Sequence, residues 1–99
     1  MGYRMTSLVP PSVLLVDDEA SFVATLSKRI AKRDLKVTTA YSGPEALDQL
    51  ASGGGVAAFD VVILDVKMPG MGGMETLACI KKAHPNIEVI MLTGHATVE

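Results

Sequence analysis

Four short apolar runs, separated by segments with helical periodicity, constrain the fold of this chain more than any other feature. The runs are residues 13–16, 37–40, 61–64 and 89–92. Such short runs bounded by polar residues are typical of strands buried in a sheet. Strands that alternate with helices form βαβ units, which require a parallel sheet with right-handed crossovers. The sequence therefore predicts an α/β fold with a doubly wound parallel sheet.

The segments between the runs carry the signals of helices. Apolar residues spaced four apart in 22–30 mark one face of a first helix. Residues 42–45 read Ser-Gly-Pro-Glu, which is typical of a capping box with Ser42 as N-cap and Glu45 at the third helical position. Pro85 predicts that a third helix ends near His84, because proline disfavours helical geometry in the residue before it.

Length and composition favour one small domain. The chain has 99 residues, which suits a single core. Pro10 and Pro11 indicate that 1–11 is a flexible N-terminal tail and that the domain covers 12–99. No apolar run approaches the roughly 20 residues of a membrane span, and the first residues lack the apolar stretch of a signal peptide. We therefore expect a cytoplasmic protein without a membrane contact.

The charge of the chain argues against direct binding of nucleic acid. The formal net charge is −2, whereas nucleic-acid modules normally carry a basic patch or stripe. Basic residues do cluster at 28–33. We interpret this cluster as the solvated face of the first helix.

Polar side chains directly follow three of the apolar runs. Asp17 and Asp18 follow the first run, Asp65 follows the third and Thr93 follows the fourth. The carboxyl ends of parallel strands meet at one edge of the sheet, where ligands bind in open α/β folds. A single aspartate there would be explained equally well as a turn former or helix cap. Three converging carboxylates repel one another unless a cation compensates, and Mg²⁺ prefers such oxygen ligands.

These residues resemble the receiver domains of response regulators. The matching segments are 16–19 (VDDE), 64–71 (LDVKMPGM) and 91–94 (MLTG). The resemblance covers 12–99 and implies a flavodoxin-like receiver fold with a phosphoacceptor role in two-component signalling. The ending at 92–99 is similar to receivers that drive AAA+ transcriptional activators, and it fits a receiver attached to a histidine kinase equally well.

The resemblance also implies roles for individual residues. Asp65 would accept a phosphoryl group from a sensor histidine kinase. Asp18, Asp65 and the backbone carbonyl of Lys67 would bind Mg²⁺ directly, with Asp17 acting mostly through water. Thr93 would hydrogen-bond the phosphoryl group and act as a switch toward an output domain or downstream protein. Such a domain promotes its own phosphorylation and dephosphorylation and is not classed as an enzyme.

The sequence departs from the family pattern at its end. The family's fold has five strands, and its fifth strand ends in a lysine that pairs with the phosphoryl group, whereas this sequence stops at Glu99. We therefore expect an incomplete receiver without the fifth strand and last helices. The run at 89–92 would then be an exposed apolar sheet edge, which a homodimer or domain swap could cover.

Three other functions compete with the receiver interpretation. A phosphatase of the haloacid-dehalogenase type has a second acidic residue at the position of Lys67. A dinucleotide-binding module has a glycine at the position of Glu75. A pseudo-receiver that only binds proteins would typically have lost its acidic residues, which are intact here, and it would gain support if the family's lysine were missing from the native protein. The pseudo-receiver therefore stays as the alternative.

Overall fold

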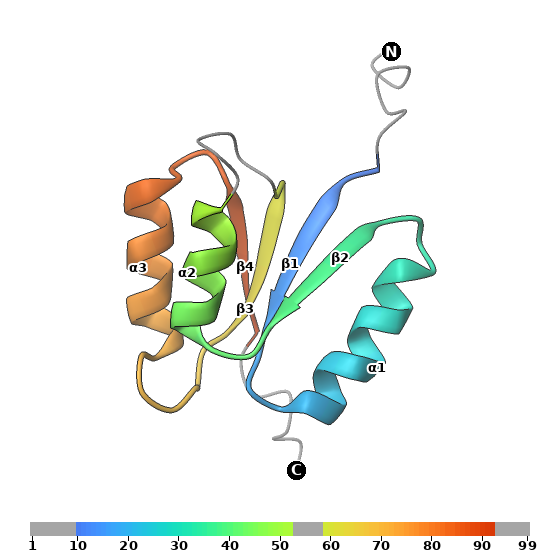
Figure 1. Cartoon of the computed structure of the whole chain (residues 1–99), viewed down its shortest axis with the longest axis horizontal. Coiled ribbons are helices and arrows are strands. Elements are labelled where there is room, and N and C mark those ends of the chain that lie inside the picture. The colour runs from blue at the N-terminus through green and yellow to red at the C-terminus, as the bar shows by residue number, and fades with distance from the viewer. Residues whose placement is uncertain (1–9, 53–58, 93–99) are drawn as a thin grey trace.

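The computed structural model describes residues 10–52 and 59–92. Their elements are, in chain order, β1 (Ser12–Val16), α1 (Ala20–Ala31), β2 (Lys36–Ala40), α2 (Gly43–Ala51), β3 (Val61–Asp65), α3 (Gly73–Ala83) and β4 (Glu88–Leu92). The predicted strands are confirmed, each longer than its apolar run by one residue. The alternation of strands and helices confirms the expected α/β class (Figure 1).

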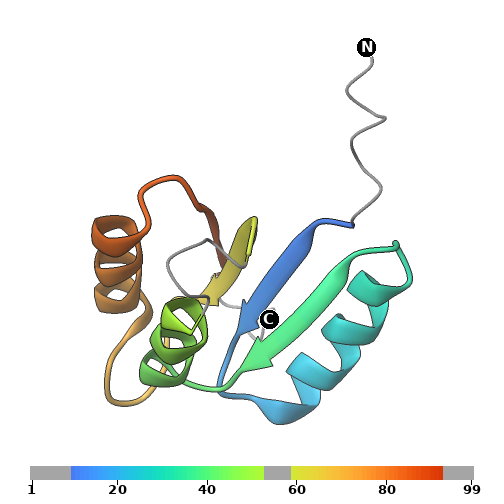
Figure 2. The ribbon, with the colours of Figure 1, turned by 45° about the horizontal axis from the view of Figure 1, so that its top comes forward.

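The strands form one parallel sheet in the order β2-β1-β3-β4. Helices α2 and α3 lie together on one face and α1 lies on the other, as Figures 1 and 2 show. The order of the strands reverses between β1 and β3, because β2 lies to one side of β1 and the later strands lie to the other. This reversal is the switch point at whose carboxyl edge ligands bind in such sheets.

The main core lies between the sheet and the pair α2 and α3. Leu14, Val16, Val62 and Leu64 point to this face and are fully buried, together with Ile80 of α3. Full burial of each such side chain contributes about 1.5–3 kcal/mol relative to leaving it exposed. This packing fixes the carboxyl ends of β1 and β3 relative to each other.

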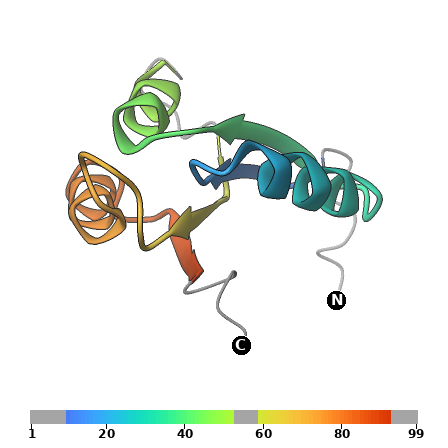
Figure 3. The same cartoon turned by 90° about the horizontal axis from the view of Figure 1, so that it is seen from below.

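The opposite face of the sheet is only partly covered in the described part of the chain. Helix α1 packs against β1 and β2 (Figure 3), where Leu15 and Val23 are buried. Ile63 of β3 is half-buried, and Ile90 of β4 is 49% exposed. β4 is an edge strand of the described sheet, and the expected exposure of its apolar run is confirmed for Ile90, whereas the other three residues of the run are half-buried.

Local signals at the helix ends agree with the sequence, with one difference. The Ser42 hydroxyl accepts a hydrogen bond from the Glu45 N–H at 3.1 Å, a cap that contributes about 1 kcal/mol. The Glu45 carboxylate accepts from the N–H of Tyr41 at 2.9 Å, one residue before the N-cap that a capping box would use. Helix α3 ends as predicted, with His84 as its C-cap. None of the described helices has the length and apolar character needed to cross a membrane.

Candidate metal and phosphoacceptor site

Two neighbouring strands present the acidic residues at the switch point. Val16 of β1 pairs with Leu64 of β3, so Asp17 directly after β1 and Asp65 at the end of β3 come one position later, side by side. The N–H of Asp17 donates to the carbonyl of Ala40 at 3.1 Å, which extends the pairing of β1 with β2 by one residue. The backbone of Asp17 is therefore held on the sheet.

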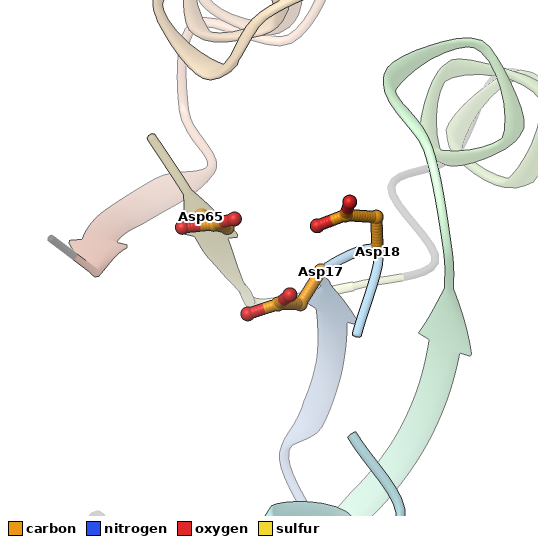
Figure 4. A group of neighbouring side chains, drawn as sticks. All are labelled: Asp17, Asp18 and Asp65. Atoms are coloured by element: carbon orange, nitrogen blue, oxygen red, sulfur yellow. The ribbon is translucent and has the colours of Figure 1, made fainter. Parts of the chain in front are cut away.

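Asp17, Asp18 and Asp65 gather at this edge, as Figure 4 shows, with the carboxylate of Asp18 directed toward Asp65. One carboxylate oxygen from each residue lies within 4.8 Å of the other two. Asp17 is fully buried and Asp65 is 5% exposed, whereas Asp18 is exposed. The group is therefore shielded on its sheet side and open to a ligand at Asp18.

The electrostatics of this group favour a bound cation. Two unit charges no more than 4.8 Å apart repel by at least about 3.5 kcal/mol at an effective dielectric constant of about 20. Asp17 and Asp65 are both buried, so water screens their mutual repulsion poorly. Three carboxylate oxygens form a hard donor set, which suits Mg²⁺ with retained waters. The residues present fit the ion that the resemblance implies.

Asp17 also has a local structural role. Its Oδ1 accepts a hydrogen bond from the Glu19 N–H at 2.9 Å, and Glu19 is the N-cap of α1. An aspartate that bonds its own backbone two residues later forms an Asx-turn. The turn-forming interpretation of this residue is therefore correct, and it holds the carboxylate in a fixed orientation at the site.

The backbone that leaves Asp65 is anchored on both sides. The N–H of Val66 donates to the carbonyl of Leu92 at 3.1 Å, and the carbonyl of Val66 accepts from the N–H of Gly73 at 3.0 Å. Lys67 follows with an exposed side chain. Binding of a metal by its backbone carbonyl stays a prediction.

Thr93 was predicted to belong to this site, whereas Gly73 was not. Thr93 lies outside the described residues, so its contact with a phosphoryl group stays a prediction. Gly73 approaches the backbone after Asp65 closely. The paired glycines Gly72 and Gly73 at a helix start are the one visible signal of this approach, and they give no indication of which backbone lies nearby.

Comparison with known protein families gives a direct match. Residues 13–99 match the family model of the response regulator receiver domain. The chain is 38% identical over 87 residues to the DNA-binding transcriptional regulator NtrC of Escherichia coli (strain K12). This alignment covers 88% of the chain but 18% of NtrC, so the chain spans less than a fifth of that relative.

Solved structures agree in fold. The response regulator TrrA of Thermotoga maritima, in complex with Mg(2+)-BeF, has a TM-score of 0.78 and 34% identity, covering 87% of this chain and 71% of that one. The complex of histidine kinase ThkA with TrrA gives a TM-score of 0.78 and 32% identity, covering 90% of this chain and 73% of that one.

Proposed function

This chain belongs to the response regulator receiver domain family, and on that premise we propose that it is the phosphoacceptor of a two-component response regulator. In this proposal Asp65 takes a phosphoryl group from a sensor histidine kinase. The observation that carries it is the convergence of Asp17, Asp18 and Asp65 at the carboxyl edge of β1 and β3. In this proposal the domain is a signalling element that phosphorylation switches, and another domain or a downstream protein produces the response.

The reaction is a displacement at phosphorus. A carboxylate oxygen of Asp65 forms a bond to phosphorus while the bond from phosphorus to the donor's imidazole nitrogen breaks, and that nitrogen keeps the electron pair. The backbone pairing of Asp65 with Leu92 holds the attacking residue at a fixed place. Positioning of this kind supplies much of the catalysis in phosphoryl transfer.

Asp17, Asp18 and Asp65 would hold Mg²⁺, with the Lys67 carbonyl as a further ligand. Bound there, Mg²⁺ would neutralise charge on the transferring phosphoryl oxygens. The carboxylate of Asp18 is the accessible member of the group, so ion and donor would enter from its side. Asp17 is fixed by its bond to the Glu19 N–H and would act through water.

The partners follow from the comparisons as proposals. The structure of ThkA with TrrA supports a histidine kinase as the phosphoryl donor, and NtrC supports an output in transcription. A cytoplasmic setting is part of the same proposal. Thr93 would sense the new phosphoryl group through a charge-assisted hydrogen bond. The exposed Ile90 on β4 supports pairing between two copies of the chain.

The alternative is a pseudo-receiver that binds proteins without phosphotransfer. Nothing in the described residues favours it, because the three acids are present and lie together.

The proposal predicts that the chain gains one phosphoryl group when it is incubated with acetyl phosphate and Mg²⁺. Acetyl phosphate serves as a small donor that requires no matched kinase. The product is an acyl phosphate, so intact-mass measurement should show a gain that hydroxylamine removes. Chelation of Mg²⁺ with EDTA should suppress the gain. A chain that stays unmodified with Mg²⁺ present would favour the pseudo-receiver.

A further inference from the structure

We propose that Gly73, the first residue of α3, is a positioning residue for metal binding, an inference that rests on the proposed function. Its lack of a side chain allows α3 to pack directly on the backbone that joins Asp65 to Lys67. This backbone carries the phosphoacceptor at one end and the proposed carbonyl ligand at the other. Gly73 itself touches neither the ion nor the donor.

The space around Gly73 explains why a glycine stands there. A Cβ at this position would collide with the carbonyl oxygen of Asp65 and would lie 2.6 Å from the Cα and 2.7 Å from the carbonyl oxygen of Val66. Among the described glycines, only Gly70 has a positive φ. The requirement at Gly73 is therefore one of space and does not come from a left-handed backbone.

The backbone that would be struck has little freedom to move. The N–H of Val66 is bonded to the carbonyl of Leu92, and its carbonyl is bonded to the N–H of Gly73 itself. Asp65 pairs with Leu92 in the sheet. An added methyl group can therefore be accommodated only if α3 moves away or if the segment from Asp65 onward shifts.

A shift of the segment changes the site directly, whereas a movement of α3 would loosen the core around Ile80. The carboxylates of Asp17 and Asp18 stand on the β1 side, whereas Asp65 and Lys67 stand on the side that Gly73 supports. A shift of this segment alters the distances from Asp65 and the Lys67 carbonyl to the other two carboxylates. Metal sites tolerate deviations of only about 0.5 Å in ligand placement, so the loss should appear in metal affinity.

Two other positions provide matched comparisons. A Cβ at Gly72 would meet nothing within 4 Å, and its backbone, with φ −75° and ψ 171°, accepts an alanine. Leu50 of α2 is 3% exposed and belongs to the core cluster. Gly72→Ala therefore tests the same chemical change without the collision, and Leu50→Ala tests lost stability without contact with the site.

The experiment measures Mn²⁺ binding to the whole chain from the electron paramagnetic resonance signal of free Mn²⁺. Mn²⁺ serves as the probe because it takes the same oxygen ligands as Mg²⁺. We expect Gly73→Ala to bind Mn²⁺ about 10–100-fold more weakly than wild type, as when a residue that supports metal ligands is lost. Gly72→Ala and Leu50→Ala should stay within about twofold of wild type, since neither changes the donor set. Circular dichroism identifies conditions in which each variant is folded, with sucrose added to favour the compact state where needed.

Each result decides between distinct conclusions. Wild-type Mn²⁺ affinity in folded Gly73→Ala would overturn the inference, and so would a variant that stays unfolded in sucrose, because Gly73 would then serve the fold. Equal weakening in Leu50→Ala would also overturn it. A wild-type chain that binds no Mn²⁺ at all would instead remove the proposed function.

Discussion

Replacement of Asp65 by asparagine is expected to abolish phosphoryl uptake from acetyl phosphate. The amide has nearly the same size but lacks the anionic oxygen that attacks phosphorus. Asp65 pairs with Leu92 through its backbone, so the end of β3 should stay in place. Intact-mass measurement of wild type and Asp65→Asn under identical conditions checks this expectation.

Asp60→Asn is the matched control for this change. Asp60 precedes β3 at its opposite end, and its Oδ2 accepts a hydrogen bond from the Ser12 N–H at 2.8 Å, which an amide oxygen can also accept. This variant should take up the phosphoryl group like wild type. Uptake by Asp65→Asn at the wild-type level would show that another residue is the acceptor.

Replacement of Asp18 by asparagine is expected to weaken Mg²⁺ binding at least about 10–100-fold, the loss typical even of residues that only support metal ligands. Asp18 is exposed, and the change should therefore leave the core intact. At a Mg²⁺ concentration of about 100 times the wild-type dissociation constant, bound ion stabilises the fold by about 2.7 kcal/mol. In Asp18→Asn the same concentration should contribute only about 0.4–1.4 kcal/mol.

Urea unfolding with and without Mg²⁺ measures the increase in unfolding free energy that Mg²⁺ gives to wild type and to Asp18→Asn. Glu19→Gln is the control, because Glu19 is the adjacent exposed carboxylate and does not belong to the cluster. It should keep the full Mg²⁺ increment. An undiminished increment in Asp18→Asn would place the ion elsewhere.

Excess Mg²⁺ distinguishes the metal-binding role of Asp18 from the nucleophilic role of Asp65. Phosphoryl uptake by Asp18→Asn should recover as Mg²⁺ is raised, because the nucleophile is intact and only the affinity for the ion has fallen. Asp65→Asn should stay inactive at every Mg²⁺ concentration.

The strands and the convergence of acids could be predicted because both depend on local sequence. The apolar runs end where Asp17 and Asp65 begin, and parallel strands bring such ends to one edge. The bond from the Glu45 carboxylate to the Tyr41 N–H was not predicted, because a capping pattern specifies residue types but leaves open which nearby N–H the carboxylate reaches.

The close packing of Gly73 could not be predicted for a different reason. It depends on where α3 crosses the backbone after Asp65, which is a contact between elements and leaves no periodic signal. The partial covering of the sheet face on which α1 packs could not be predicted for the same reason. The apolar stripe in 22–30 predicts that α1 packs on the sheet, but it does not indicate that α1 leaves Ile63 of β3 partly exposed.

The most direct test of the phosphoacceptor role is to locate the phosphoryl group in the chain. Borohydride reduces an aspartyl phosphate to homoserine, so peptide mapping by mass spectrometry after acetyl phosphate treatment marks the acceptor residue. We predict homoserine in place of Asp65 and unmodified aspartate at Asp17 and Asp18. Homoserine at another position, or a phosphoryl group that borohydride does not remove, would contradict this assignment.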